Sequence, residues 1–511
     1  MNAAAETASA QLDGTNSKVA DSRNHAWLRA VLVFVCVLVP SLCMWLYVFP
    51  GFLQPDHAMT IAYLATGTYD AWHSVFWALL AKPLLYDAPS YGWYGLAQLL
   101  VYAGAITFSI VRLRKLDVVS TAGMWVLVAV FALSPCFVLY NVTYSSDIVF
   151  ATLLVPYTVL LVELAVTRLE SLKRPGFLAG LMVMTFVLLE LRKNALLIPL
   201  VLLVVLLIVR RDLWKRILTG VLVPVVAFLG VNAVFDAAFD VQKSPSQELM
   251  SVPAMQVARV YAAGLQVPGD VDAYFTSIRP AEEWKGNYGD GRSADSEKQG
   301  LELTPEFIRN WAELGARSPT VYTSAYWTLM KHFFTMDPAP TVALDFSAYP
   351  QFTTIPCKSL CKTEYEQQMT APQTEHQSEV LQWFTRLFGT PVLMQTIGRL
   401  FFNTALPFWT LLAVFLVLMF RKKRKRLLIA LVPMASLFLA FLCFSPIVLI
   451  RYAMEMYYMV PVLVAVAVSR VPLAMSPRGA GKPSSVAKSG MPASSARLTE
   501  ENKAEERKAE K

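Results

Sequence analysis

The sequence lacks the short motifs that identify most soluble enzymes. It contains no P-loop, no GxGxxG dinucleotide-binding pattern, no HExxH zinc motif and no GxSxG nucleophile elbow. Its five histidines do not have the spacing of metal ligands. These absences argue against the common nucleotide-dependent, zinc-dependent and serine-hydrolase classes, and no metal site is predicted from the residues.

Charged residues are also scarce. They make up only 16% of the 511 residues, whereas 55% are hydrophobic, and the mean hydropathy is +0.45. This composition is typical of a polytopic membrane protein. The formal net charge of +8 comes mostly from short loops, where basic residues set orientation by the positive-inside rule. The charge therefore implies no nucleic acid as a partner.

The N-terminus does not have the pattern of a cleaved signal peptide. Residues 1–25 are polar and lack periodicity, which is typical of a disordered tail. The apolar run that follows, from Trp27 to Val48, is too long for a signal peptide and lacks a small-residue cleavage pattern. Residues 471–511 are rich in Ser, Pro, Lys and Glu, and they are predicted to form a second disordered tail.

Apolar runs long enough, or nearly long enough, to cross a bilayer recur along the chain. We predict an all-α polytopic membrane protein with about ten transmembrane helices. They lie near residues 27–48, 92–111, 118–139, 148–167, 177–191, 195–209, 217–236, 403–420, 427–449 and 454–469. With both termini in the cytoplasm, every strongly basic short loop falls on the cytoplasmic face, as the positive-inside rule requires.

The fifth and sixth runs are short, with only about 15 apolar residues each where roughly 20 are needed to span. Merging them would place the next basic loop on the wrong side of the membrane. We therefore predict a tight hairpin whose turn, Arg192-Lys193-Asn194, lies near the outer surface. Its two cations either belong to an outward functional site or extend to the headgroups of the outer leaflet.

The predicted topology divides the chain into membrane and outward parts. Residues 26–237 form the N-terminal membrane domain, whose first extracytoplasmic loop (49–91) is the predicted reaction centre. Residues 238–400 form an extracytoplasmic domain between helices 7 and 8, and residues 401–470 form the last membrane helices. The outward domain is predicted to be mainly helical, because Thr304-Pro305 is a typical helix start and residues 378–388 are amphipathic.

Cysteine is uncommon, with six residues in the chain. Four lie in apolar runs, where a thiol is usually a small core residue. Cys357 and Cys361 lie in the outward segment, where an oxidising compartment favours a disulfide that closes a small loop. Two thiols four residues apart without a nearby histidine pair make a weak metal site.

Ionisable residues gather at the outward ends of the predicted spans. They are Asp56, Asp70 and His73 in the first loop, Asp147 after the third span, Arg192 and Lys193 after the fifth, and Arg451 before the tenth. A carboxylate can take a proton from an attacking hydroxyl while Arg and Lys bind a departing phosphate. The set therefore suits transfer from an anionic lipid carrier. Glu163, midway along the fourth span, is a further carboxylate that can pair within the bundle or line a cavity.

These residues also have structural explanations. Asp56 and Asp70 can each cap a following helix, since Asp is a favoured N-cap residue. His73 can be a polar residue at the membrane interface. Arg451 and Glu455 lie four apart on one helix and can pair with each other.

Six short segments of the sequence, taken together, form a recognisable layout. They are PDHAMTIAYLATGTYDAWHS in the first loop, TYSSDIVFA around Asp147, LRKNALLIP around Arg192, MQVARVYAAG around Arg259, EEWKGNY around Trp284 and IRYAMEMYYMVP around Arg451. With many spans and a late outward domain, this layout resembles the GT-C superfamily of integral-membrane glycosyltransferases, and more particularly a less characterised group of bacterial proteins within or near it. The resemblance covers most of residues 45–470.

The resemblance implies a reaction and its partners. The donor would be a polyprenyl-phosphate sugar, and the acceptor an envelope glycan or glycolipid at the outer face of the bacterial cytoplasmic membrane. Asp56 would be the catalytic base or a metal-associated carboxylate. The remaining site residues would be Asp70 and Asp147 as catalytic carboxylates, with His73, Arg192, Lys193, Arg259 and Arg451 binding substrate. No cofactor is required by the sequence, although a divalent cation is compatible with it.

Two other functions fit the same residues. A transporter or lipid flippase would use the charges as a translocation path, but transporters usually show internal repeats and ionisable groups near the midplane, and no repeat is visible here. A scaffold subunit of an envelope-assembly complex would bind partners through the outward domain. The scaffold hypothesis predicts that Asp56 is dispensable.

Overall fold

The computed structural model describes residues 26–53, 55–69, 71, 74–239, 241, 249–287, 294, 297–336, 374–444 and 450–469. Within these ranges the chain is almost entirely helical, and the sole sheet pairs two short strands, β1 (Phe52–Leu53) and β2 (Thr143–Tyr144). The predicted helical fold class is therefore confirmed. Both predicted tails, together with Cys357 and Cys361, lie outside the described residues.

In the described ranges, six helical segments are long and apolar enough to cross a membrane. They are Ala26–Tyr47, α4 (Gly92–Lys115), α7 (Ser146–Val166), Arg211–Phe239 with η3 (Arg211–Leu213) and α10 (Trp214–Phe239), Arg424–Cys443 in η8 (Lys422–Leu431) and α23 (Val432–Phe444), and Ile450–Val468 with α24 (Ile450–Tyr457) and α25 (Val460–Val468). Such helices indicate a multi-pass membrane protein.

Two bent helix pairs raise this number to eight if each pair is one span. The first pair is α5 (Thr121–Leu133) with α6 (Pro135–Asn141), bent by 54°. The second runs from α20 (Pro391–Leu393) through η7 (Met394–Gly398) and α21 (Arg399–Phe401) to α22 (Leu406–Phe420), bent by 46°. Proline at the first or second position of α6 and α22 fits a helix that restarts after a break.

The fifth and sixth predicted runs are the shorter apolar helices α8 (Pro175–Leu191) and α9 (Leu197–Val209), which η2 (Lys193–Leu196) joins. The chain leaves the helix at Arg192, whose backbone is extended, so the break lies where the sequence predicts the hairpin turn. Ten spans in total remain a prediction.

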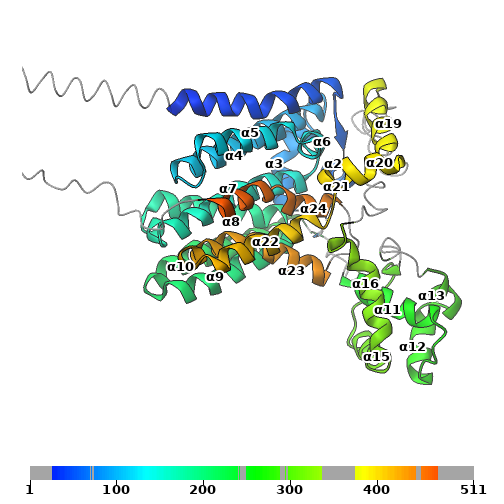
Figure 1. Cartoon of the computed structure of the whole chain (residues 1–511). Helices are drawn as coiled ribbons and strands as arrows, with labels where there is room; N and C mark the ends of the chain where they lie inside the picture. Colours follow the sequence, from blue (N-terminus) through cyan, green and yellow to red (C-terminus); the bar gives the residue numbers. More distant parts are fainter. Residues whose placement is uncertain are drawn as a thin grey trace, which may run out of the picture. The chain divides into compact units, whose positions relative to one another are not determined.

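Helix α7 is the most buried of the membrane helices, with 94% of its apolar window inside the protein. Its sequence is apolar on every side, as expected for a helix surrounded by others. It packs against α4, α8, α24 and η8. In Figure 1, α4, α7 and α8 run side by side along the bundle.

The strand pair connects two distant parts of the chain. β1 and β2 are parallel, with Phe52 opposite Thr143 and Leu53 opposite Tyr144. Each strand is followed directly by a helix, α2 (Pro55–Thr66) after β1 and α7 after β2. Because parallel strands leave a sheet in the same direction, the first turns of α2 and α7 lie near each other.

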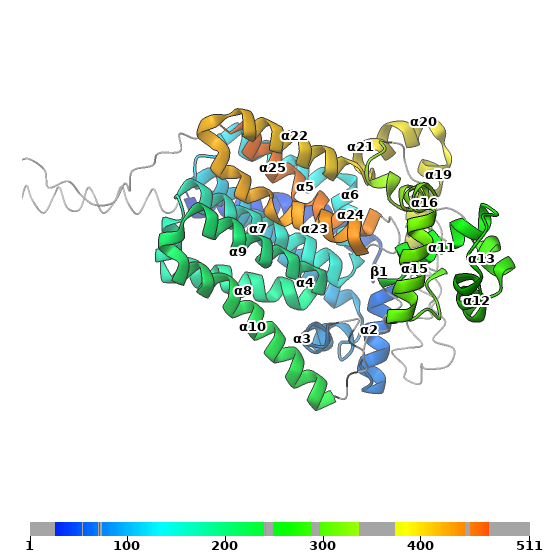
Figure 2. The same ribbon diagram turned by 90° about the horizontal axis from the view of Figure 1, so that it is seen from below.

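Two short helices, α2 and α3 (Val75–Leu85), occupy the first predicted outward loop. In Figure 2, α3 lies between α4 and α10 and beside α2, all of which it contacts. The N-cap of α3 is Ser74, whose hydroxyl accepts a hydrogen bond from the Trp77 amide at 3.0 Å. The alternative in which Asp70 caps this helix is therefore wrong.

Residues 251–330 form a helical cluster with its own apolar core. Its helices are α11 (Ser251–Ala262), α12 (Gly269–Ile278), α13 (Ala281–Asn287), α15 (Pro305–Arg317) and α16 (Pro319–Met330), with η5 (Lys331–Phe333) following. Phe275, Trp284 and Phe307 are completely or almost completely buried in it. The predicted helix start is confirmed, because the Thr304 hydroxyl accepts from the Phe307 amide at 3.0 Å.

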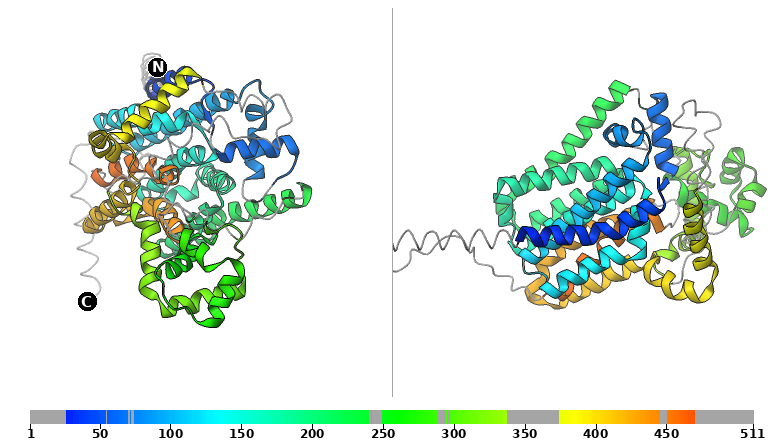
Figure 3. Two further views of the ribbon diagram at one scale, coloured as in Figure 1. Left: turned by 90° about the vertical axis from the view of Figure 1, so that its right-hand side faces the viewer. Right: turned by 90° about the horizontal axis from the view of Figure 1, so that it is seen from above.

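The predicted amphipathic segment is helix α19 (Glu375–Gly389), which starts with a capping box at Thr374 and Gln377. It runs across the direction of the bundle helices in Figures 1 and 3. The Gln377 amide donates to the carbonyls of Gly51, at 2.8 Å, and Val48, at 3.3 Å. Helix α19 therefore holds the chain at the point where the first loop begins.

Candidate functional site

Arg192 joins three helices at one end of the bundle. Its Nε donates to Oδ1 of Asp147 at 2.9 Å, and its Nη2 lies 2.5 Å from Oδ2. Its Nη1 lies 2.7 Å from Oε1 of Glu455. The side chains are 15%, 6% and 0% exposed for Arg192, Asp147 and Glu455. One buried guanidinium thus compensates two buried carboxylates, from α7 and α24.

The local sequence explains why Asp147 points to this place. Ser145 is the N-cap of α7, and its hydroxyl accepts from the Asp147 amide at 3.1 Å. Asp147 then lies in the first helical turn, where the helix dipole favours a negative charge. The pair with Arg192 adds a bidentate charge-assisted interaction, which is the strongest common form of ion pair.

Arg451 joins the same cluster through Tyr452. The Arg192 guanidinium lies 5.5 Å from the Tyr452 ring centroid, and that of Arg451 lies 4.8 Å from it. Arg451 also donates to the Tyr452 hydroxyl at 2.8 Å. Two cations therefore share one aromatic ring. Glu455, for which the sequence offers Arg451 as one partner, is ion-paired with Arg192.

Lys193 links this cluster to the first loop, because its ammonium donates to the carbonyl of Ala71. Ala71 lies between Asp70 and His73, which are outside the described residues. The backbone places Asp56 as the second residue of α2, inside the helix and past the N-cap position, and its side chain is not among those described. Arg259 lies on α11, in the helical cluster of residues 251–330.

Glu190 is not among the site residues predicted from the sequence. This residue ends α8 two positions before Arg192 and is only 2% exposed. Asn232 of α10 donates to its Oε1 at 3.3 Å, while Oε2 has no hydrogen-bond partner within the described residues. The signal was a lone carboxylate at the end of the apolar run that leads into the Arg192-Lys193 turn.

The opposite end of α7, and not its middle as predicted from the sequence, carries a second ion-paired group. Glu163, 1% exposed, accepts from Arg112 at 2.6 and 2.5 Å and from Arg174 at 2.5 Å. Of the two alternatives for Glu163, pairing within the bundle is therefore confirmed. The pairs join α4, α7 and the start of α8.

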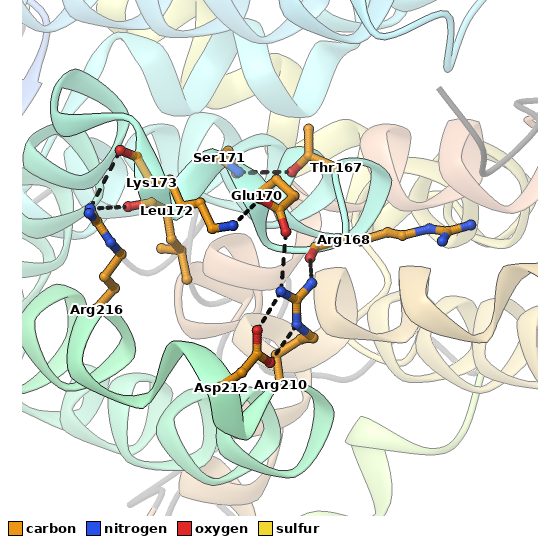
Figure 4. A network of polar contacts seen from close by, with 9 residues as sticks. All are labelled: Thr167, Arg168, Glu170, Ser171, Leu172, Lys173, Arg210, Asp212 and Arg216. Carbon is orange, nitrogen blue, oxygen red and sulfur yellow. Dashed lines mark hydrogen bonds and ion pairs between the residues drawn. The ribbon is translucent and has the colours of Figure 1, made fainter. Parts of the chain in front are cut away.

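Close to this end, polar contacts hold two loops together (Figure 4). Arg210 donates to the Arg168 carbonyl at 2.7 Å, to Glu170 of η1 (Glu170–Lys173) at 3.1 Å and to Asp212 at 2.7 Å. Arg216 donates to the carbonyls of Leu172 and Lys173. The loops before α8 and after α9 are thus neighbours, so the chain returns to the same end of the bundle after these two helices.

No group of three or more His, Cys, Asp or Glu side chains in the described ranges is arranged to hold a metal ion. The three carboxylates nearest the Arg192-Lys193 turn have other surroundings. Asp147 and Glu455 face a guanidinium, and Glu190 faces an amide.

Comparison with known families gives one match for this part of the chain. Residues 91–273 match a family of unknown function, DUF6020. The matched region is similar to that family from α4 to α12 and contains Asp147, Glu190, Arg192 and Lys193, but not α24 with Glu455. No curated protein and no solved structure matches the chain.

Proposed function

We propose that the protein is a membrane glycosyltransferase. It would move a sugar from a polyprenyl-phosphate donor to an envelope glycan or lipid acceptor at the outer face of the bacterial cytoplasmic membrane, with ten spans and cytoplasmic termini. The observation that supports this best is the β1–β2 pair. Asp56 and Asp147 are each the third residue beyond a paired strand residue, Leu53 and Tyr144 respectively, so the predicted base and a member of the charged cluster occupy equivalent positions after the two strands.

The proposed reaction is a direct displacement. The acceptor hydroxyl oxygen attacks the anomeric carbon of the donor sugar, and its proton passes to the Asp56 carboxylate. The bond between the anomeric carbon and the phosphate oxygen breaks, and the electron pair leaves with the lipid phosphate. Lys193 and Arg451 stabilise the departing phosphate, because the Arg192 charge is already shared between two carboxylates.

The positions of the charges favour this proposal over a flippase. Asp147 and Glu163 lie toward opposite ends of α7, and each is ion-paired. A translocation path needs ionisable groups near the middle of the membrane. The described charges of α7 instead lie near its two ends, and Asp147 lies at the end that also carries Arg192 and Glu455.

The test compares wild type with Asp56→Asn in liposomes that contain radiolabelled polyprenyl-phosphate sugars and membrane glycolipid. Loss of a general base should lower transfer by about 100-fold or more, with unchanged expression. Asp117→Asn is the matched control, since Asp117 is an exposed carboxylate in the loop after α4 that pairs with its neighbour Arg114. Full activity of Asp56→Asn would remove the base assignment. Absence of transfer by wild type with every donor would remove the function.

A further inference from the structure

Glu190 differs from the other buried carboxylates near the Arg192-Lys193 turn. Asp147 and Glu455 each face the Arg192 guanidinium at 2.5 to 2.9 Å. Glu190 is paired with no guanidinium among the described residues, and its carboxylate accepts a hydrogen bond from the neutral amide of Asn232 at 3.3 Å. Its Oε2 has no hydrogen bond within the described part of the chain. An unsatisfied buried carboxylate is costly in an apolar protein interior, so a functional role accounts for it better than a stabilising one.

The surroundings of Glu190 come from the predicted reaction centre. The Ser74 side chain and the Lys193 ammonium both lie close enough to interact with its carboxylate. One turn earlier on α8, the Phe186 ring lies 5.6 Å from that of Phe76, at the start of α3. The first outward loop therefore rests on the end of α8 that carries Glu190. Asn232, from α10, fixes the carboxylate from the other side.

A carboxylate next to cations matches the two halves of a sugar phosphate. Hydroxyl groups of a sugar donate hydrogen bonds, and a carboxylate accepts them strongly, whereas Lys and Arg bind the phosphate. Glu190 and Lys193 are three residues apart and supply both kinds of group at one helix end.

We infer that Glu190 is a substrate-binding residue that accepts hydrogen bonds from the hydroxyl groups of the donor sugar, while the neighbouring cations hold its phosphate. The inference rests on the proposed function and names the group that recognises the sugar. Asn232 is the positioning residue, because its amide leaves Oε2 as the oxygen available to the ligand.

The experiment measures binding of two kinds of lipid probe, with and without a sugar, to the full-length protein in nanodiscs. The probes are polyprenyl phosphate, and polyprenyl phosphate carrying glucose, galactose, mannose, N-acetylglucosamine or arabinose. Wild type should bind at least one sugar-bearing lipid more tightly than the bare phosphate. Glu190→Gln, which keeps the shape and removes the charge, should weaken binding of that lipid by about tenfold or more. Binding of polyprenyl phosphate should change by less than about twofold, since the phosphate contacts remain.

Two further variants complete the design. Asn232→Leu should also weaken binding of the sugar-bearing lipid and leave binding of polyprenyl phosphate unchanged. This variant tests the role of Glu190 if Glu190→Gln does not fold. Glu170→Gln, an exposed carboxylate at the other end of the bundle, should bind both probes as wild type does. A variant that weakens both lipids equally, or neither, would overturn the role of Glu190 and leave the glycosyltransferase proposal intact. Wild type that binds no probe would overturn both.

Discussion

Arg192 shows what one residue does at this site. A buried guanidinium without partners would be strongly destabilising, and so would either of its two carboxylates alone. Together they satisfy one another, and the Tyr452 ring covers the guanidinium at 5.5 Å. Arg192 therefore primarily holds α7, α8 and α24 in register. Lys193 and Arg451 are the better candidates for direct contact with a phosphate.

Glu297 gives a pH-dependent prediction outside the membrane helices. Burial raises the pKa of its carboxyl to about 7, although Arg279 opposes the shift with an ion pair at 2.9 Å. The folded protein then binds more protons than the unfolded chain between the ordinary pKa of 4.5 and about 7. The contribution of this carboxyl to the free energy of unfolding is fully present below pH 4.5, and it is lost as the pH rises to about 7. Thermal unfolding of the full-length protein should therefore show a loss on the order of 3 kcal/mol between pH 4.5 and 7.5 that Glu297→Gln abolishes. An identical pH profile for both proteins would contradict this cause.

At the scale of elements, the strand pair depends on Gly51. Its φ is +100°, and a Cβ there would lie 2.2 Å from the Tyr144 hydroxyl oxygen, which itself donates to the Pro50 carbonyl at 2.5 Å. Gly51→Ala should therefore force β1 away from β2, lower the melting temperature and reduce transfer activity. Gly67→Ala is the matched control, because Gly67 also has a positive φ, +69°, but has open space around it. Equal melting temperatures for the two variants would show that the contact with Tyr144 is not decisive.

Elements whose residues are close together in the sequence could be predicted. Contacts between residues far apart in the sequence could not. The helix start at Thr304 follows from a hydroxyl, a proline and an apolar face within one turn. The β1–β2 pair consists of two-residue strands about ninety positions apart, too short to have a periodicity. The alternative that pairs Glu455 with Arg451 depends on a local rule, since helix neighbours four apart commonly pair. Its partner Arg192 comes from another helix, which no local pattern reveals.

At the scale of the whole molecule, the topology can be tested with single cysteines in a chain whose six native cysteines are changed to serine. Lys285 of α13 and Lys173 of η1 are both half exposed or nearly so and suit this purpose. A membrane-impermeant maleimide should label Lys285→Cys in intact cells, because residues 238–400 are predicted to face outward. Lys173→Cys should react only after lysis. Lys215→Cys should behave like Lys173→Cys, since Arg216 contacts the Lys173 carbonyl. The opposite labelling pattern would reverse the proposed orientation.

Helices α7 and α8 are tied together at both ends. Asp147 meets Arg192 at one end and Glu163 meets Arg174 at the other. Sliding one helix past the other by a single turn, about 5.4 Å, would break both ties at once. The two helices therefore move as one rigid body in any working cycle. An opening that admits a long lipid chain must form at the borders of this body, where α3, α10 and α24 pack against it.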